Sequence, residues 1–159
     1  MLFRSTGTNF AAGLTTVRFG SSAGTSVNVT STTSLTVVAP AGAAGTVDVT
    51  VTTPGGTSSA AGTGNDFTYW AAPTVTALSP TSGPIAGGQT VTVTGTGFDV
   101  VSSVTFGGVA GTSVSVASPT SLTVVSPAGS IGTVDVVVNA TGGASSTAGT
   151  GNDYRYFGV

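Results

Sequence analysis

The sequence contains no lysine, glutamate, histidine or cysteine, and its charged residues are three arginines and five aspartates among 159 residues. Without histidine or cysteine, the chain lacks the usual zinc ligands, a thiol nucleophile and an imidazole general base. We therefore expect a protein that is not an enzyme, with no catalytic, cofactor-binding or metal-binding residues and no cofactor. The absence of cysteine also excludes disulfides.

Positive charge is equally scarce, and the net charge at neutral pH is −2. Affinity for nucleic acid depends on clustered lysine and arginine, which release counterions from the phosphate backbone, so we expect no nucleic-acid partner. No apolar run approaches the roughly 20 residues that a membrane helix needs. Arg4 interrupts the apolar start, so residues 1–10 do not read as a signal peptide. We expect no membrane insertion by this segment.

Valine, threonine and 25 glycines dominate instead. Val and Thr favour strands and Gly favours turns, and no segment has an apolar period of 3.6 residues, so the fold class predicted is all-β without significant helix. In "TVDVVV", Val134, Val136 and Val138 fall on one face of a strand. The strands expected in the second half are 74–78, 90–94, 103–106, 113–116, 121–125, 133–139 and 153–157.

The two halves of the chain repeat each other. Residues 19–70 align without gaps with residues 106–157, and about two-thirds of the aligned positions are identical. "SLTVVAPAGAAGTVDVTV" returns as "SLTVVSPAGSIGTVDVVV", and "AGTGNDFTYW" returns as "AGTGNDYRYF". Each copy contains short strands with turn signals every 8 to 12 residues or so, which is typical of a β-sandwich. The sequence therefore predicts two tandem sandwiches joined by the short connector "YWAAP".

The second copy resembles a known family. "PTVTALSPTSGPIAGGQTVTVTGTGFDVVSSVTFGG", followed by "SPTSLTVVSPAG", "GTVDVVV" and "DYRYF", is similar to the IPT/TIG family of immunoglobulin-like domains. The resemblance implies an immunoglobulin-like β-sandwich in which Phe98, Phe106 and Tyr156 belong to the core. Gly87-Gly88 and Gly107-Gly108 can supply the positive φ angles of tight turns, and Gly95 and Gly97 indicate a bulge or a close backbone approach.

The first copy matches this pattern only from the end of its second strand. The domains expected are thus 1–70, a sandwich lacking its first strand, and 71–159, a complete sandwich. Phe3 and Ser5 fall where Val91 and Val93 lie in the second copy and are expected to point inward. We interpret the start as a cut edge rather than a leader. The first domain is expected to be marginally stable, with an unpaired edge open to another strand.

The most site-like motif is "GTGND", present at residues 62–66 and 149–153. Calcium needs six to eight oxygen ligands, whereas Asn and Asp terminate turns through their own backbone, so we interpret both copies as turns. Asp48 and Asp135 lie mid-strand and are expected to be solvated, with no second acid near enough for catalysis. Asp99 is expected in a loop.

Two further motifs carry little weight. Asn28-Val-Thr30 and Asn139-Ala-Thr141 fit the N-glycosylation sequon, which arises often by chance in a threonine-rich chain. Trp70 has the kind of aromatic side chain on which sugars can stack. We expect it instead to end the last strand of the first copy, with Phe157 as its counterpart, and to pack at the domain junction.

The function expected is a non-catalytic interaction module: tandem immunoglobulin-like repeats serving as spacer or adhesive stalk of a larger bacterial cell-surface or secreted protein. The alternative is a carbohydrate-associated accessory domain of a secreted polysaccharide-degrading enzyme, which predicts exposed aromatic side chains along one face. The expected partners are a protein or surface glycan and the neighbouring repeats of the parent chain. The expected location is extracellular or at the bacterial cell surface, with the signal peptide outside this segment.

Overall fold

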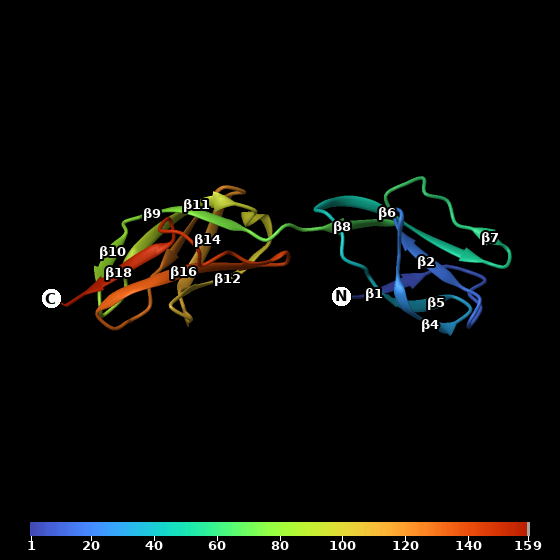
Figure 1. Cartoon of the computed structure of the whole chain (residues 1–159), viewed down its shortest axis with the longest axis horizontal. Helices are drawn as coiled ribbons and strands as arrows, with labels where there is room; N and C mark the ends of the chain where they lie inside the picture. Colours follow the sequence, from blue (N-terminus) through green and yellow to red (C-terminus); the bar gives the residue numbers. More distant parts are fainter. Residues whose placement is uncertain (159) are drawn as a thin grey trace. The chain divides into compact units, whose positions relative to one another are not determined.

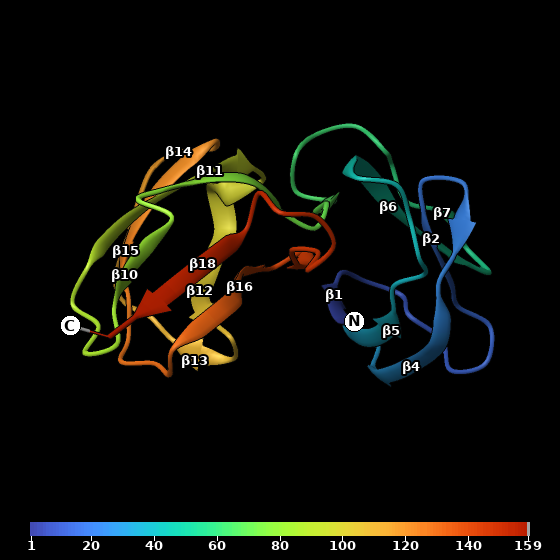
Figure 2. The same ribbon diagram turned by 60° about the vertical axis from the view of Figure 1, so that its left-hand side comes forward.

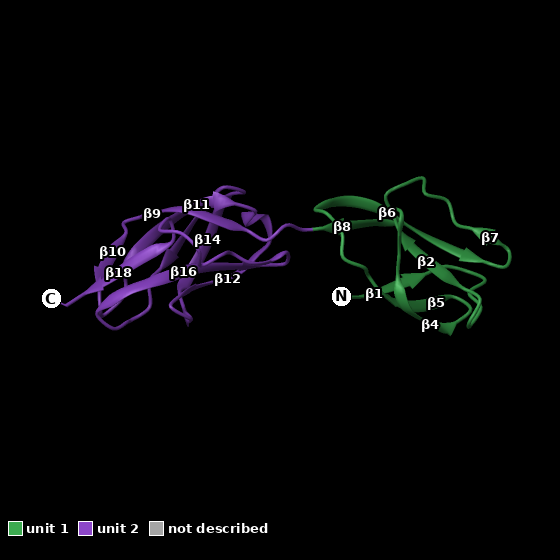
Figure 3. Cartoon of the chain, in the orientation of Figure 1, with its two compact units in different colours: residues 1–69 green, residues 70–159 purple. Residues whose placement is uncertain are grey.

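A computed structural model describes residues 1–158 and divides the chain into two compact units (Figure 3). Unit 1 is Met1–Tyr69 and unit 2 begins at Trp70, one residue earlier than the boundary expected from the repeat. Both units consist of strands, and the one helical turn among the described residues is the 3-10 turn η1 (Phe98–Val100), which contains Asp99. The all-β class is therefore confirmed. No helix in the described part of the chain has the length and apolar character needed to span a membrane.

One sheet of unit 2 contains four antiparallel strands in the order β14-β15-β11-β9. Alternating valines in β11 explain why it is central: Val91 and Val93 are fully buried, while the intervening threonines face outward. The strands of this sheet are β9 (Thr74–Ser79), β11 (Thr90–Thr96), β14 (Thr112–Ser118) and β15 (Ser121–Val125).

The second sheet of unit 2 has the order β10-β18-β16-β12-β13 (Figures 1 and 2). Strand β17 pairs with β16. The one parallel pair of this sheet joins β10 to β18, with Gly83 opposite Tyr156. The strands are β10 (Ser82–Pro84), β12 (Val101–Phe106), β13 (Val109–Ala110), β16 (Gly132–Ala140), β17 (Gly143–Ala144) and β18 (Asp153–Phe157). The seven longer strands were all expected from the sequence, whereas β10, β13 and β17 were too short to be recognised.

Unit 1 repeats this architecture without counterparts of β9 and β10 among residues 1–69. Its sheets have the orders β1-β5-β4 and β3-β2-β6-β7, with β8 also pairing β6. The strands are β1 (Leu2–Thr6), β2 (Thr16–Phe19), β3 (Ser22–Ala23), β4 (Thr25–Ser31), β5 (Ser34–Val38), β6 (Gly45–Thr53), β7 (Gly56–Thr57) and β8 (Asp66–Tyr69). Strand β1 therefore takes the place of β11 but lies at the edge of its sheet.

Each unit has its own apolar core between its two sheets. In unit 2 the core combines the valines of β11 and β16 with Phe98, Phe106, Tyr154 and Tyr156. Unit 1 has the equivalent core, and Phe3 packs against it and contacts the rings of Phe19 and Phe67 edge to face. The inward positions expected for Phe3 and Ser5 are confirmed, because both alternate with exposed neighbours along β1.

Glycines determine the backbone at the points where the strands turn. Gly87, Gly88, Gly107 and Gly108 all have positive φ, as the sequence predicted. The register of the β9–β11 pair shifts at Gly95, which confirms the expected bulge. The turns are thus encoded locally, because residues with a side chain adopt positive φ only with strain. Gly95 does not have positive φ, and a side chain is excluded there because an added Cβ would collide with Thr74 O.

A tyrosine hydroxyl ties the last strand of each unit to a proline carbonyl. The Tyr156 hydroxyl donates to Pro127 O at 2.9 Å, and the Tyr69 hydroxyl donates to Pro40 O at 3.0 Å. Burial raises the pKa of Tyr156 above its ordinary value, and neighbouring Tyr154 adds to the shift. By contrast, the buried Tyr154 hydroxyl has no hydrogen-bond partner among residues 1–158, and unit 1 has Phe67 at that position.

These two tyrosines should respond differently to removal of the hydroxyl. We expect Tyr156→Phe to lower the free energy of unfolding of unit 2 by about 1 kcal/mol, because Pro127 O loses its donor. Tyr154→Phe should leave stability unchanged or raise it, since it removes an unpaired buried group. Urea titrations at pH 7 measure both, and equal losses in the two variants would contradict the prediction.

The raised pKa of Tyr156 has a consequence for pH dependence. Below the unfolded pKa of about 10, the tyrosine is protonated in both states and its full contribution is present. Above that pH the unfolded chain ionises first, so unit 2 loses stability as pH rises through the folded pKa. Tyr156→Phe is expected to reduce this alkaline loss in the same titrations repeated above pH 9.

Candidate functional site

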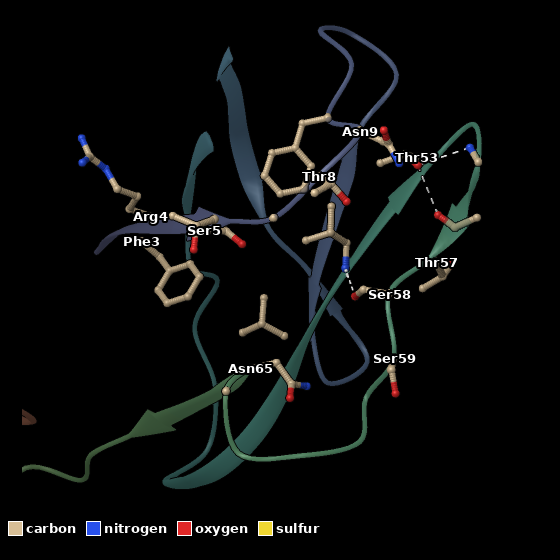
Figure 4. Close-up of a pocket in the computed structure, with 18 residues that line it drawn as sticks. Phe3, Arg4, Ser5, Thr8, Asn9, Thr53, Thr57, Ser58, Ser59 and Asn65 are labelled. Carbon is tan, nitrogen blue, oxygen red and sulfur yellow. Dashed lines mark hydrogen bonds between the residues drawn. The ribbon is translucent and has the colours of Figure 1, made fainter. Parts of the chain in front are cut away.

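Unit 1 contains an open groove with a volume of about 510 Å³. One wall is β1 and the loop that follows it, and the other is formed by β6, β7 and the loop leading to Asn65 (Figure 4). An apolar cavity of about 150 Å³ already holds a benzene molecule. The groove is therefore large enough for several side chains.

The floor of the groove is apolar and its rim is uncharged except for Arg4. Phe3, Phe10, Val49 and Val51 form the floor, all in contact with the core of unit 1. The rim is formed by serine, threonine, asparagine and glycine residues: Ser5, Thr6, Gly7, Thr8, Asn9, Thr53, Gly55, Gly56, Thr57, Ser58, Ser59, Gly64 and Asn65. The groove thus offers an apolar surface and neutral hydrogen-bonding groups.

The wall formed by β6 and β7 is held in place by its own hydrogen bonds. Val51 N donates to Ser58 Oγ at 3.0 Å, and Ser58 N donates back to Val51 O at 2.8 Å (Figure 4). The equivalent residues of unit 2, Val138 and Ser145, make the same two bonds at 3.0 and 2.9 Å. This wall of the groove therefore has the same hydrogen-bonded arrangement in both units.

In unit 2 the equivalent groove is filled by the segment from Trp70 to Leu78. An added Cβ on Gly142 would collide with the carbonyl group of Ala71, and one on Gly151 would lie 2.5 Å from Thr76 O. In unit 1 the equivalents are Gly55 and Gly64. A Cβ there would meet only Thr53 Oγ1, at 3.7 Å from Gly55, and nothing within 4 Å of Gly64.

Residues beside the groove are more buried in unit 2, where the groove is filled, than in unit 1, where it is open. Ser145 and Asn152 are buried, at 5% and 2% exposed, whereas their unit 1 counterparts Ser58 and Asn65 are exposed and half-buried. Val138 is fully buried in unit 2, and its counterpart Val51 is 8% exposed. The segment over the groove therefore covers surface that unit 1 leaves accessible.

The GTGND segments are turns, as expected, and each is fixed by its asparagine. Asn152 Nδ2 donates to Asp135 Oδ1 at 3.0 Å, and Asn65 Nδ2 donates to Asp48 Oδ1 at 3.3 Å. The main-chain carbonyl oxygen of each asparagine also accepts a hydrogen bond from the central strand: Val49 N of β6 donates to Asn65 O at 2.7 Å, and Val136 N of β16 donates to Asn152 O at 2.8 Å. The side chain and backbone of the asparagine together hold the turn against the central strand.

The expectation that Asp48 and Asp135 are solvated and far from a second acid is wrong. Asp48 lies directly opposite Asp66, and Asp135 lies opposite Asp153, across neighbouring strands. Both central aspartates are half-buried and accept the asparagine bond described above. Sequence spacing missed the pairs because the partners meet only through strand pairing. Residues 1–158 contain no group of three or more Asp, Glu, His or Cys placed to hold a metal.

The remaining candidate residues are dispersed. Trp70 lies beyond the end of β8 rather than within it, and it is 45% exposed. Phe157 belongs to β18 and is 44% exposed. Of the two sequon asparagines, Asn28 is exposed on β4, while Asn139 is half-buried and donates to Ser103 Oγ at 3.1 Å.

The groove itself was missed from the sequence, although the sequence contained a signal for it. The glycines at Gly55 and Gly64 recur as Gly142 and Gly151. Only the second copy has a segment that explains why these positions lack a side chain. A glycine conserved between two repeats of one chain, where only one repeat requires it, indicates a shared covering element.

Comparison with protein families supports the repeat. A model described as the IPT/TIG domain matches residues 5–69 and again residues 73–156. No curated protein matches the chain. The two matches cover almost all of units 1 and 2, and the second includes β9 and β10.

Among solved structures, the plexin A4 extracellular region matches with a TM-score of 0.54 and 18% identity, covering 98% of this chain and 16% of that one. SGBP-B from a xyloglucan utilization locus in Bacteroides uniformis matches with a TM-score of 0.43 and 24% identity, covering 91% of this chain and 43% of that one. A Bacteroides ovatus SGBP-B in complex with a mixed-linkage heptasaccharide has a TM-score of 0.41 and 17% identity, at 99% and 42% coverage. The chain thus spans less than half the length of each of these proteins, and the likeness to plexin A4 shows the fold.

Proposed function

The chain belongs to the IPT/TIG domain family, and we propose that it works as a non-catalytic spacer or adhesive stalk segment in a larger bacterial cell-surface or secreted protein. One observation carries the proposal: the chain enters and leaves unit 2 at opposite ends. Ala71 lies against Gly142, just after β16 ends, whereas Tyr156 pairs with Gly132, where β16 begins (Figure 1). A nine-residue strand spans about 30 Å, so each such unit advances the chain by roughly that distance.

The surface of unit 2 is consistent with a structural role. Its exposed aromatic residues, Trp70 and Phe157, lie at these opposite ends. Trp70 adjoins Gly142, whereas Phe157 lies at the end of β18, opposite Pro84 of β10. A sugar-stacking platform requires aromatic rings close together on one face, so their separation favours the spacer over the carbohydrate-associated alternative.

The spacer role predicts that length grows with the number of units. We expect small-angle X-ray scattering to give a maximum dimension that increases by a constant increment of about 30 Å or more when one and then two additional copies of residues 70–158 are fused after residue 158. A maximum dimension that stays constant, which would mean that the units fold back on one another, would contradict the role. Incubation with insoluble glucans provides the control for the alternative, since a spacer should remain in the supernatant.

A further inference from the structure

We propose that Asn28 is an acceptor for N-glycosylation and takes a sugar from a donor in which the sugar is joined through a diphosphate to a lipid or a nucleoside. The proposal is independent of the spacer role, which depends on the path of the chain through unit 2. It rests on three features of Asn28: a recognition sequence that the fold does not require, a side chain that faces solvent, and a position on an irregular edge strand.

The repeat shows that the strand does not require the sequon. Residues 25–38, "TSVNVTSTTSLTVV", correspond to residues 112–125, "TSVSVASPTSLTVV", and the two segments differ only at positions 28, 30 and 32 of the first. Asn28 and Thr30, which define the sequon, are replaced by Ser115 and Ala117. Both segments nevertheless form the same pair of strands, with register shifts at equivalent positions. Since asparagine is also depleted in strands, the fold gives no reason for its presence here.

The side chain of Asn28 is accessible from solvent. Val27 and Val29 pack against the core of unit 1, and side chains alternate along a strand, so Asn28 points outward and is exposed. Its amide makes no hydrogen bond within residues 1–158. Thr30 is exposed as well, and its hydroxyl donates to Ser34 O at 3.1 Å. A transferase can therefore reach the amide nitrogen of Asn28 in the folded chain.

The backbone around Asn28 is weakly held. Strand β4 lies at one end of the β1-β5-β4 sheet, and its one strand partner among residues 1–158 is β5. The register shifts between Thr25 and Asn28 and again between Val29 and Ser31, so irregular pairing lies on both sides of the Asn28–Val29 step. Such irregularities disrupt the ladder of hydrogen bonds. Binding of this segment by a transferase therefore costs few backbone hydrogen bonds.

The second sequon has none of these properties. Asn139 lies in β16, where it is paired on both sides, with Ser103 of β12 and with Ala144 of β17. It is half-buried, and its amide donates to Ser103 Oγ at 3.1 Å. The structure thus distinguishes two motifs that the sequence alone presents as equivalent, and it assigns the modification to Asn28.

The transfer exchanges one bond of the sugar for another. The amide nitrogen of Asn28 forms a bond to the anomeric carbon, while the bond from that carbon to the diphosphate oxygen breaks. The diphosphate leaves with the electron pair, and the amide proton passes to a base of the transferase. No oxidation or reduction takes place, so the sugar diphosphate is the one co-reactant that the step needs.

The test treats the folded full chain with two transferases whose donors differ. One arm contains a soluble asparagine glucosyltransferase with UDP-glucose, and the other contains a membrane oligosaccharyltransferase with a lipid diphosphate oligosaccharide. Both enzymes are first selected to modify synthetic peptides of residues 24–34 and 135–145 at similar rates. Intact mass and peptide mapping then locate the sugar.

We expect modification of Asn28 in at least one arm, and the arm that reacts identifies the donor. Asn139 should react at least about tenfold more slowly, because a transferase reaches it only in locally opened molecules. Absence of sugar at Asn28 in both arms would overturn the proposal. Equal rates at the two asparagines would do the same, since the structural distinction between them would then have no effect.

Matched variants test whether the sequon and the edge strand are both needed. Asn28→Ser and Thr30→Ala each introduce the residue that unit 2 has at the equivalent position, so β4 should keep its fold while the modification is lost. The double variant Ser115→Asn with Ala117→Thr gives β14 the same sequon and should gain a second modified site. Modification that persists in Thr30→Ala would refute recognition of the sequon. An unmodified β14 in the double variant would refute the edge strand as the reason for the accessibility of Asn28.

Discussion

Residues 1–70 expressed alone are expected to unfold at a markedly lower temperature than residues 71–159 expressed alone. Unit 2 buries Leu78 and packs Val75 and Ile85 against its core, and all three come from the segment that contains β9 and β10. Unit 1 has an open groove of about 510 Å³ in the place of β9. We therefore expect the absence of this segment to be the main cause of the difference in melting temperature.

The expected difference is large compared with the total stability of such a domain. Fully burying one leucine, valine or isoleucine side chain contributes about 1.5–3 kcal/mol, and because Val75 and Ile85 are only half-buried, the three together contribute roughly 3–6 kcal/mol. A domain of this size has a free energy of unfolding of roughly 4–13 kcal/mol. Loss of the segment thus removes a substantial part of the margin, and unit 1 should be only marginally folded on its own.

Differential scanning calorimetry of the two fragments and of the whole chain measures this prediction. In the whole chain we expect two transitions, with the upper one accompanied by a change in the fluorescence of Trp70, which is the only tryptophan and belongs to unit 2. Equal melting temperatures of the two fragments would refute the prediction. Circular dichroism at low temperature provides the control that residues 1–70 are folded before they are heated.

The second large effect concerns equivalent glycines in the two repeats. Gly151→Ala and Gly142→Ala are each expected to destabilise unit 2 by about 1–3 kcal/mol or more, because the new methyl group collides with the backbone of the segment from Ala71 to Thr76. Backbone atoms cannot move aside as a flexible side chain can. The collision should therefore displace β9 from its sheet.

The same substitutions in unit 1 serve as matched controls. Gly55→Ala and Gly64→Ala place a methyl group in open space at positions without positive φ, so they should leave unit 1 unchanged or stabilise it by about 0.4–1 kcal/mol through the unfolded state. Urea denaturation of all four variants in the whole chain measures the contrast. If the unit 1 variants lose as much stability as the unit 2 variants, then the two grooves do not differ in the way described.

The amino-acid sequence by itself determined the features that depend on local pattern. The alternation of Val134, Val136 and Val138 identified an inward face of β16, and the positive φ angles at Gly87 and Gly107 followed from the turn signals. Repetition extended these predictions to unit 1, including the inward positions of Phe3 and Ser5. Such features are predictable because side-chain periodicity and glycine conformation are properties of a few neighbouring residues.

Only the tertiary structure decided which distant residues meet. Asp48 faces Asp66, and Asn65 bonds to Asp48, because β6 pairs with β8 in one particular register. The groove also depends on segments that are distant in the sequence, because one wall is β1 at the start of unit 1 and the other is formed by residues 49–65 near the end of unit 1. Strand pairing joins segments far apart in the chain. Their register depends on the whole set of backbone hydrogen bonds and buried side chains, which no local pattern contains.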